Sequence, residues 1–203
     1  PSDFDAALTE LEDRGLLQWD RDADTYDLHP VVRGYSFNQL QDRVGTYGRI
    51  ADYFNERPKD DYDEAESLDD LRLSLMVYRA LVGAGRLEAA AEFYRGSFAD
   101  ALFFQLNAYA TMIELLTPHF PKGDLDALPV IEDARLKSSI LNYFALALQS
   151  TGSSRAALHQ VALALALELE GSNARELSIY LSNYASALQD LNGLAGSHRA
   201  RSL

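Results

Sequence analysis

Residues 134–149 read ARLKSSILNYFALALQ, and residues 174–189 read ARELSIYLSNYASALQ. The second stretch starts 40 positions after the first, and the two are identical at eight of 16 positions. Among the shared positions, 135, 138, 141, 145 and 148 recur at spacings of three and four, which is the period of one face of an α-helix. An internal repeat of this length predicts consecutive helical units that stack on one another and bury a continuous core.

The rest of the chain beyond residue 67 is also expected to be helical. Predicted helices cover residues 68–82, 87–96, 98–116, 133–150, 156–170 and 175–191. Glycines and prolines separate them, including Gly152 after the first copy of the repeat and Gly193 after the second. An acidic stretch that begins at Pro58 has no apolar period. The sequence therefore predicts three parts: residues 1–57, an acidic linker at residues 58–70, and helical repeats at residues 71–203.

Large and small side chains alternate in a fixed order within the first copy of the repeat. Large, large, small and large residues stand at Leu141, Phe144, Ala145 and Leu148, before a glycine turn and a second helix with Ala157 and Ala164. Small residues allow the two helices of a pair to approach closely, while large residues fill the layer between pairs. This order resembles the tetratricopeptide (TPR) repeat, and the resemblance implies an α-α superhelix.

The match to that family is incomplete. The period is 40 residues, whereas about 34 is usual for the family. Asn192 stands where the second copy should carry its turn glycine, although Asn tolerates the left-handed conformation. The chain reaches Leu203 where the second helix of that copy should begin, so we expect the array to be truncated.

The resemblance implies a concave groove, lined by the first helix of each pair, that holds a partner protein or peptide. The groove-facing positions correspond to Asn142, Leu146 and Gln149 in the first copy and to Ser182, Ser186 and Gln189 in the second. Asn and Gln side chains can bond both donors and acceptors of an extended peptide backbone. The alternative is that these side chains are only solvated helix faces.

The first third of the chain is strongly acidic. The net charge of the whole chain is −13. Residues 1–70 hold 19 acidic and 7 basic side chains, so this part contributes −12 of that charge. Nucleic acids are bound chiefly through phosphate contacts from Lys and Arg. In the first predicted helix, Asp5, Glu10 and Glu12 would meet phosphates with the wrong sign. We therefore expect no direct binding of nucleic acid.

A helix, a small hairpin and a second helix are predicted before residue 40. Gly15 ends the first helix, residues 17–19 and 26–28 alternate as strands do, and residues 20–25 suit their loop. Pro30 suits the first position of the second helix. The stretches AALTELEDRGLL (residues 6–17) and YDLHPVVR (residues 26–33) resemble the winged helix of signal-transduction ATPases with numerous domains, the STAND or NB-ARC class.

That resemblance implies a nucleotide-binding core upstream in a longer parent protein, and a first residue of Pro1 rather than Met fits such a fragment. His29 corresponds to the histidine that contacts the ADP phosphate in this class, so we expect it to contact ATP or ADP in the parent. Two departures weaken the match: Pro30 replaces the usual aspartate, and the chain has no G-x-x-x-x-G-K-[ST] loop. No cofactor is therefore expected in this chain alone. The alternative role for His29 is structural, as a helix N-cap or a partly buried side chain.

No set of residues indicates a catalytic centre or a metal site. The chain has no cysteine, and His119, His159 and His198 do not stand in an H-E-x-x-H arrangement. The motifs G-x-S-x-G and G-x-G-x-x-G are also absent. No apolar run is long enough to cross a membrane and the N-terminus lacks a signal-peptide pattern, so we expect a cytoplasmic protein without membrane contact.

Taken with the two resemblances, these patterns favour a mainly α-helical, non-catalytic sensor and protein–protein interaction fragment of a larger STAND-type signalling ATPase. The repeats would bind a protein, a peptide or a small effector, and the winged helix would relay this regulatory signal to the upstream ATPase domain. Two alternatives stay open: a stand-alone TPR adaptor or scaffold, and part of a transcription regulator that binds DNA through another domain.

Overall fold

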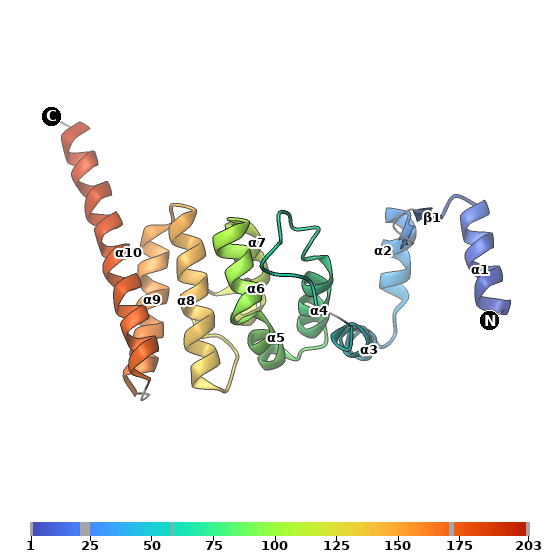
Figure 1. Ribbon diagram of the computed structural model, residues 1–203, viewed down its shortest axis with the longest axis horizontal. Helices are drawn as coiled ribbons and strands as arrows, with labels where there is room; N and C mark the ends of the chain where they lie inside the picture. The colour runs from blue at the N-terminus through green and yellow to red at the C-terminus, as the bar shows by residue number, and fades with distance from the viewer. Residues whose placement is uncertain (1, 21–24, 58, 171–172, 202–203) are drawn as a thin grey trace. The chain divides into compact units, whose positions relative to one another are not determined.

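The protein is mainly helical in the computed structural model, which describes residues 2–20, 25–57, 59–170 and 173–201 (Figure 1). Two short antiparallel strands form the sheet seen among these residues. The chain divides into two compact units, residues 1–43 and residues 44–203. No described helix is both long and apolar enough to cross a membrane.

The first unit has the predicted order of helix, hairpin and helix. Its elements are α1 (Ser2–Asp13), β1 (Leu17–Asp20), β2 (Thr25–Leu28) and α2 (Pro30–Gln39). The strand register pairs Leu17 with Leu28 and Trp19 with Tyr26, whose rings stack with centroids 5.7 Å apart. Gly15 ends α1 in the left-handed conformation, with φ of 67°. Of the predicted loop at residues 20–25, residues 21–24 lie outside the described part of the chain.

The second unit begins within α3 and continues through helix after helix to the end of the described chain. Its elements are α3 (Arg43–Asn55), α4 (Arg72–Gly83), α5 (Leu87–Tyr94), α6 (Ser97–Asp100), the π-helix η1 (Ala101–Gln105), α7 (Tyr109–Leu116), the 3-10 turns η2 (Thr117–His119) and η3 (Pro121–Gly123), α8 (Ala134–Ser150), α9 (Ser154–Glu170) and α10 (Ala174–Arg201). In Figure 1, α8, α9 and α10 stand side by side, and each packs on the next.

The division between the units lies at residues 43 and 44, whereas the sequence placed the first boundary at residues 57 and 58. The reason is that α3 packs on the second unit: Ala51 is fully buried there, and Ile50 and Phe54 lie against the same core. The acidic stretch after it is irregular but packed. The Asp60 carboxylate accepts a hydrogen bond from the backbone N–H of Ser74 at 2.7 Å, so it caps a donor in the first turn of α4.

The pair formed by α8 and α9 follows the large-and-small order seen in the sequence. Leu141, Phe144 and Ala145 of α8 and Ala157 and Ala164 of α9 are all buried. The Asp133 carboxylate accepts from the backbone N–H of Leu136 at 3.0 Å and begins α8 one residue after the predicted start.

Glycine turns follow the first helix in two helix pairs, α4 with α5 and α8 with α9. Gly152 has φ of 83° and Gly85 has φ of 71°. In each turn the next N–H, of Ser153 or of Arg86, donates back to a leucine carbonyl five residues earlier, at 2.8 Å and 2.9 Å. The two turns therefore have the same backbone hydrogen bonds, although the sequence between them is not an exact repeat.

Two predicted helices are wrong in extent. The segment 98–116 is not one α-helix, because a π-turn interrupts it at residues 101–105 and Asn107 then takes a positive φ of 49°. The helix predicted to end near residue 191 continues through Gly193 to Arg201. A single glycine inside a helix costs only about 1 kcal/mol relative to alanine, which a long helix can tolerate.

Candidate binding surface

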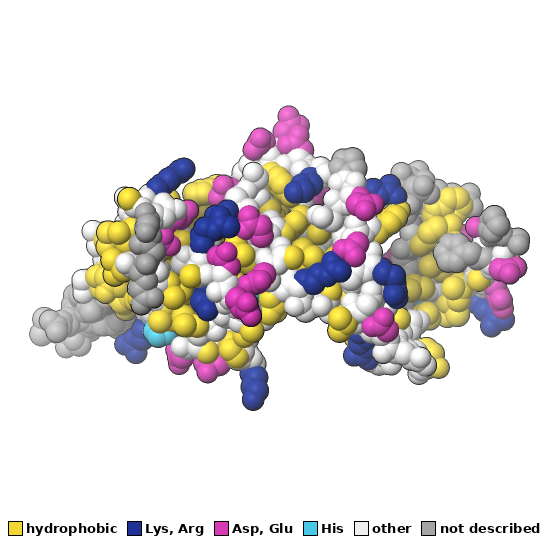
Figure 2. Space-filling view, turned by 90° about the horizontal axis from the view of Figure 1, so that it is seen from below, with side chains coloured by type: hydrophobic (Ala, Val, Ile, Leu, Met, Phe, Trp, Pro, Cys, Tyr) yellow, Lys and Arg dark blue, Asp and Glu magenta, His cyan; other side chains and the backbone are white. Residues whose placement is uncertain are grey.

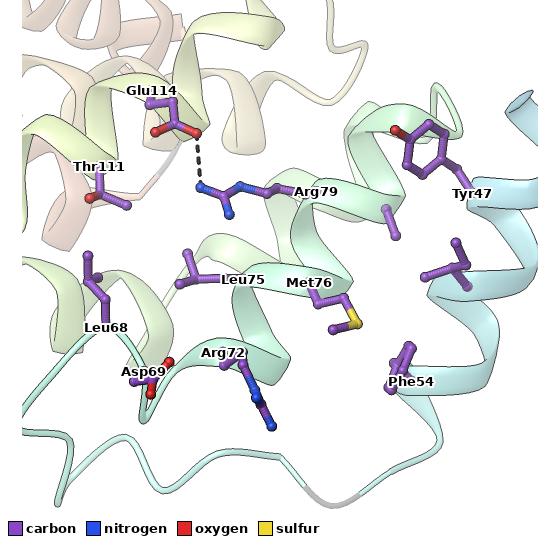
Figure 3. A pocket seen from close by; sticks show the side chains of 12 residues that line it. Tyr47, Phe54, Leu68, Asp69, Arg72, Leu75, Met76, Arg79, Thr111 and Glu114 are labelled. Atoms are coloured by element: carbon purple, nitrogen blue, oxygen red, sulfur yellow. Dashed lines mark hydrogen bonds and ion pairs between the residues drawn. The ribbon is translucent and has the colours of Figure 1, made fainter. Parts of the chain in front are cut away.

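A groove runs along one face of α4 in the second unit. It has a volume of about 810 Å³. We name it the α4 groove, and its lining residues are Tyr47, Ile50, Phe54, Leu68, Asp69, Arg72, Leu75, Met76, Arg79, Ala80, Thr111 and Glu114. Figure 3 shows Met76 projecting from α4, with α3 on one side and α7 on the other.

The floor of the groove is apolar because α4 is amphipathic. Arg72, Leu75, Met76 and Arg79 recur at spacings of three and four, which puts them on one side of the helix. Leu75 is buried, whereas Met76 is 38% exposed and so presents its thioether to solvent within the groove. A methionine in such a position adapts its shape to different apolar partners.

One wall of the groove is made by α3, which is held in place by its close approach to α4. A Cβ added to Gly83 would lie 2.7 Å from the ring of Tyr47, so only glycine leaves room for this contact. Arg86, just after α4, donates two hydrogen bonds to the carboxylate of Asp52 on α3, at 2.5 Å and 3.3 Å. These bonds lower the pKa of Asp52 and raise that of Arg86, so both stay ionised at neutral pH.

The rim of the groove carries both signs of charge. Arg79 donates to the Glu114 carboxylate at 2.9 Å, which links α4 to α7 across the groove (Figure 3). Arg72 makes no ion pair within the described chain, and Asp69 lies beside it in the lining. A wider view of the surface also shows apolar side chains interspersed with basic and acidic ones (Figure 2). Such a groove can bury apolar side chains and orient them by polar contacts at its edge.

Two of the residues predicted for a peptide groove lie in a different hollow, of about 470 Å³. Asn142 and Leu146 line it from α8, and Ile179 lines it from α10. Asn142 is almost fully buried and accepts a hydrogen bond from the amide of Asn183 at 2.8 Å. The side chain of Asn142 therefore joins two helices, and Leu146 is the more accessible of the two predicted residues.

The other predicted positions lie along the same two helices. The amide of Gln149 donates to Ser186 at 2.9 Å and to the Asp190 carboxylate at 2.6 Å. The structure therefore brings these three side chains together, and their hydrogen bonds are made with one another. Ser182 and Gln189 are exposed on α10, and neither belongs to the lining of the hollow beside Asn142.

The sequence did not predict the opposite wall of that hollow. Arg95, Asp100, Phe103 and Phe104 come from the segment that contains the π-turn. Phe104 is 71% exposed, and burial raises the pKa of Asp100. A pattern search based on the α-helical period has no means of locating a π-turn, although such turns are frequent at functional sites.

His29 is found at the start of α2, in the structural role that was the alternative to nucleotide contact. Its Nδ1 accepts a hydrogen bond from the backbone N–H of Val31 at 3.3 Å, and its own backbone N–H donates to the Leu16 carbonyl at 3.0 Å. The imidazole therefore caps the helix. The residue as a whole is exposed.

Comparisons with protein-family models, with curated proteins and with solved structures found no match to this chain. Within the described residues, no group of three or more His, Asp or Glu side chains is placed to hold a metal ion.

Proposed function

We propose that this chain is a non-catalytic protein-interaction module whose second unit binds a segment of a partner protein in the α4 groove. The observation that carries the proposal is the groove itself, with an apolar floor at Leu75 and Met76 and a charged rim at Arg72, Arg79 and Glu114. Ligands usually bind to a protein in hollows of this size that have an apolar lining and a few polar groups.

The shape of the groove favours a partner segment that alternates apolar and polar residues. Apolar side chains of the partner would cover Met76 and Leu68, which are 38% and 39% exposed. A carboxylate of the partner would pair with Arg72, which has no ion-pair partner in the described chain. Burial of the apolar side chains would supply most of the affinity, and the charge pair would set the orientation.

We further propose that the module is the regulatory arm of a larger STAND-type ATPase. Two features support this: the winged-helix resemblance of residues 6–33, and its place before TPR-like repeats. The first unit also exposes large apolar side chains on α2, with Val31 at 72% and Tyr35 at 67%. Such a surface suits contact with a further domain. In that arrangement, partner binding to the second unit would be relayed through the first.

The binding proposal is tested by panning the intact chain against a phage library of random linear peptides. Enriched peptides should bind in solution, and Met76→Glu should abolish their binding because it puts a charge on the apolar floor. The matched control is Leu169→Glu, which changes a 65% exposed leucine on α9 outside the groove lining and should leave binding unchanged. If the peptides bind wild type and Met76→Glu equally, the α4 groove is not their binding site.

The parent protein is tested separately, by sequencing the intact native polypeptide that contains this chain. A phosphate-binding loop upstream would support the regulatory-arm proposal and would make His29 a candidate for contact with the nucleotide. An upstream region without such a loop would favour the adaptor or scaffold alternative, and the α4 groove would then be its binding site.

A further inference from the structure

The chain carries two sulfur atoms, and their surroundings differ. It contains no cysteine, and its two methionines are Met76 on α4 and Met112 on α7. Met76 is 38% exposed, whereas Met112 is fully buried in the core. A dissolved oxidant can therefore reach the thioether of Met76 in the folded protein, while it reaches Met112 only when the core opens.

Met76 is part of the apolar floor of the α4 groove. Figure 3 shows its thioether pointing from α4 toward α3, and Tyr47 and Phe54 of α3 line the same groove. Leu75 beside it is buried, so Met76 is the accessible one of the two floor residues. Oxidation to the sulfoxide would put a polar S=O group on this floor, and a polar group costs free energy when an apolar partner covers it.

A basic side chain stands next to Met76 on the same face of α4. Arg72 is four positions earlier, so the two side chains are neighbours on the helix, and Arg72 makes no ion pair within the described chain. A guanidinium donates hydrogen bonds, and a sulfoxide oxygen accepts them. The sulfoxide would therefore engage Arg72, which the carboxylate of the proposed partner needs. Arg79 cannot replace it, because it is already bonded to Glu114 at 2.9 Å.

We propose that Met76 is a site of reversible oxidation, and that its sulfoxide prevents the α4 groove from binding its partner. This inference rests on the proposed function, because the groove must bind a partner for the switch to act. In the forward step, hydrogen peroxide transfers one oxygen atom to the sulfur, which is oxidised by two electrons, and the other oxygen leaves as water. In the return step, a methionine sulfoxide reductase restores the thioether and releases the oxygen as water, while a dithiol is oxidised to a disulfide.

The first measurement follows oxidation without any partner. The intact chain is treated with hydrogen peroxide and digested with trypsin, which separates Met76 in residues 73–79 from Met112 in residues 96–122. Mass spectrometry should show oxidation of Met76 at least about tenfold faster than that of Met112, because Met112 reacts only when the core opens. In urea-unfolded chain, the two methionines should react at the same rate.

The second measurement tests the switch with the peptides that phage panning enriches. Oxidised chain should bind them at least about tenfold more weakly than untreated chain, and methionine sulfoxide reductases A and B with dithiothreitol should restore the binding. Met112→Leu should keep this sensitivity to peroxide. The affinity of Met76→Leu, whatever its value before treatment, should not change with peroxide. Both substitutions nearly conserve the side-chain volume.

The outcomes separate the switch from the binding on which it rests. Equal oxidation rates of the two methionines in the folded chain would overturn the switch, and so would oxidised chain that binds the peptides as tightly as untreated chain. A peroxide effect that persists in Met76→Leu would also overturn it, because another residue would then be responsible. These three results leave the proposed binding in place. If no peptide binds in a way that depends on Met76, the proposed function fails and the switch fails with it.

Discussion

The hydroxyl oxygen of Tyr78 lies 2.8 Å from Nε2 of His119, in the interior of the second unit. Both side chains are almost completely buried. The same hydroxyl donates to the Leu115 carbonyl at 2.8 Å. Because a hydroxyl has one proton to donate, Nε2–H of His119 must donate to Tyr78, and Nδ1 is then an acceptor without a described partner. Burial without a partner for Nδ1 favours the neutral imidazole and lowers the pKa of His119.

The first prediction concerns the pH dependence of stability. Burial lowers the pKa of His119 to about 4, from an ordinary value of 6.5. Between these values the unfolded chain binds a proton that the folded chain does not, so the free energy of unfolding falls as the pH is lowered from 6.5 to 4. The full loss is about 3 kcal/mol, at 1.36 kcal/mol per pKa unit. Urea unfolding followed by circular dichroism at several pH values measures it.

His119→Gln is the control for that measurement, because it removes the titrating ring. Asp52, Asp70 and Asp133 have lowered pKa values, so their contributions begin to fall only at about pH 5, and the raised pKa of Asp100 acts in the opposite sense. These carboxylates are present in both proteins, so the difference between the two curves reports His119. A wild-type curve as flat as that of His119→Gln between pH 6.5 and 4 would contradict the prediction.

The second prediction concerns the hydroxyl of Tyr78. Tyr78→Phe should lower the free energy of unfolding by about 1–3 kcal/mol, because the Leu115 carbonyl and Nε2–H of His119 lose their partner inside the core. Tyr109→Phe is the comparison: its hydroxyl donates to exposed Asn107 at 2.6 Å, and its loss should change stability by no more than about 0.5 kcal/mol. Equal effects of the two substitutions in chemical denaturation would rule out the buried network as a source of stability.

The third prediction compares two helical glycines. Gly83→Ala places a Cβ against the ring of Tyr47 and should destabilise the fold by about 1–3 kcal/mol. Gly48→Ala meets Arg86 at an ordinary 3.5 Å and should stabilise α3 by up to about 1 kcal/mol. Thermal unfolding of both variants gives the signs. If Gly83→Ala proves neutral, α3 does not pack on α4 as described.

The fourth prediction separates the two roles of His29. His29→Asn keeps a capping side chain but removes the imidazole, whereas His29→Ala removes both. Amide hydrogen exchange at Val31 should accelerate in His29→Ala, with a cost of about 0.5–1 kcal/mol, and change little in His29→Asn. In a parent ATPase, both variants should weaken ADP binding. Unchanged ADP affinity in His29→Asn would leave the histidine with the cap alone.

Sequence patterns predicted the fold best where local signals agreed. α8 was placed to within one residue because Asp133 caps its start and Gly152 ends it. Sequence patterns failed where tertiary packing decides the structure of a segment. The sequence predicts a linker at the acid-rich residues 58–70, yet the Asp60 carboxylate accepts from a backbone N–H of α4 and Ala65 is buried. The extent of α10 was wrong because a glycine that ends one helix can lie inside another.

The hollows were harder to predict than the helices. Asn142 and Leu146 were found through the repeat, and both line a hollow, although Asn142 is already bonded to Asn183. The α4 groove was missed, because Tyr47 on α3 and Glu114 on α7 are far apart in sequence and belong to no repeat. Only folding brings them to opposite sides of the same helix.

Hydrogen bonds between side chains far apart in sequence determine how the second unit would respond to force. Tyr78 on α4 bonds His119 in η2, whereas Asn142 and Gln149 on α8 bond Asn183 and Asp190 on α10. The last two bonds join the same two helices. A load pulling on the C-terminus would act on both of them together, so α10 should detach from α8 in one step while the bond between Tyr78 and His119 still holds.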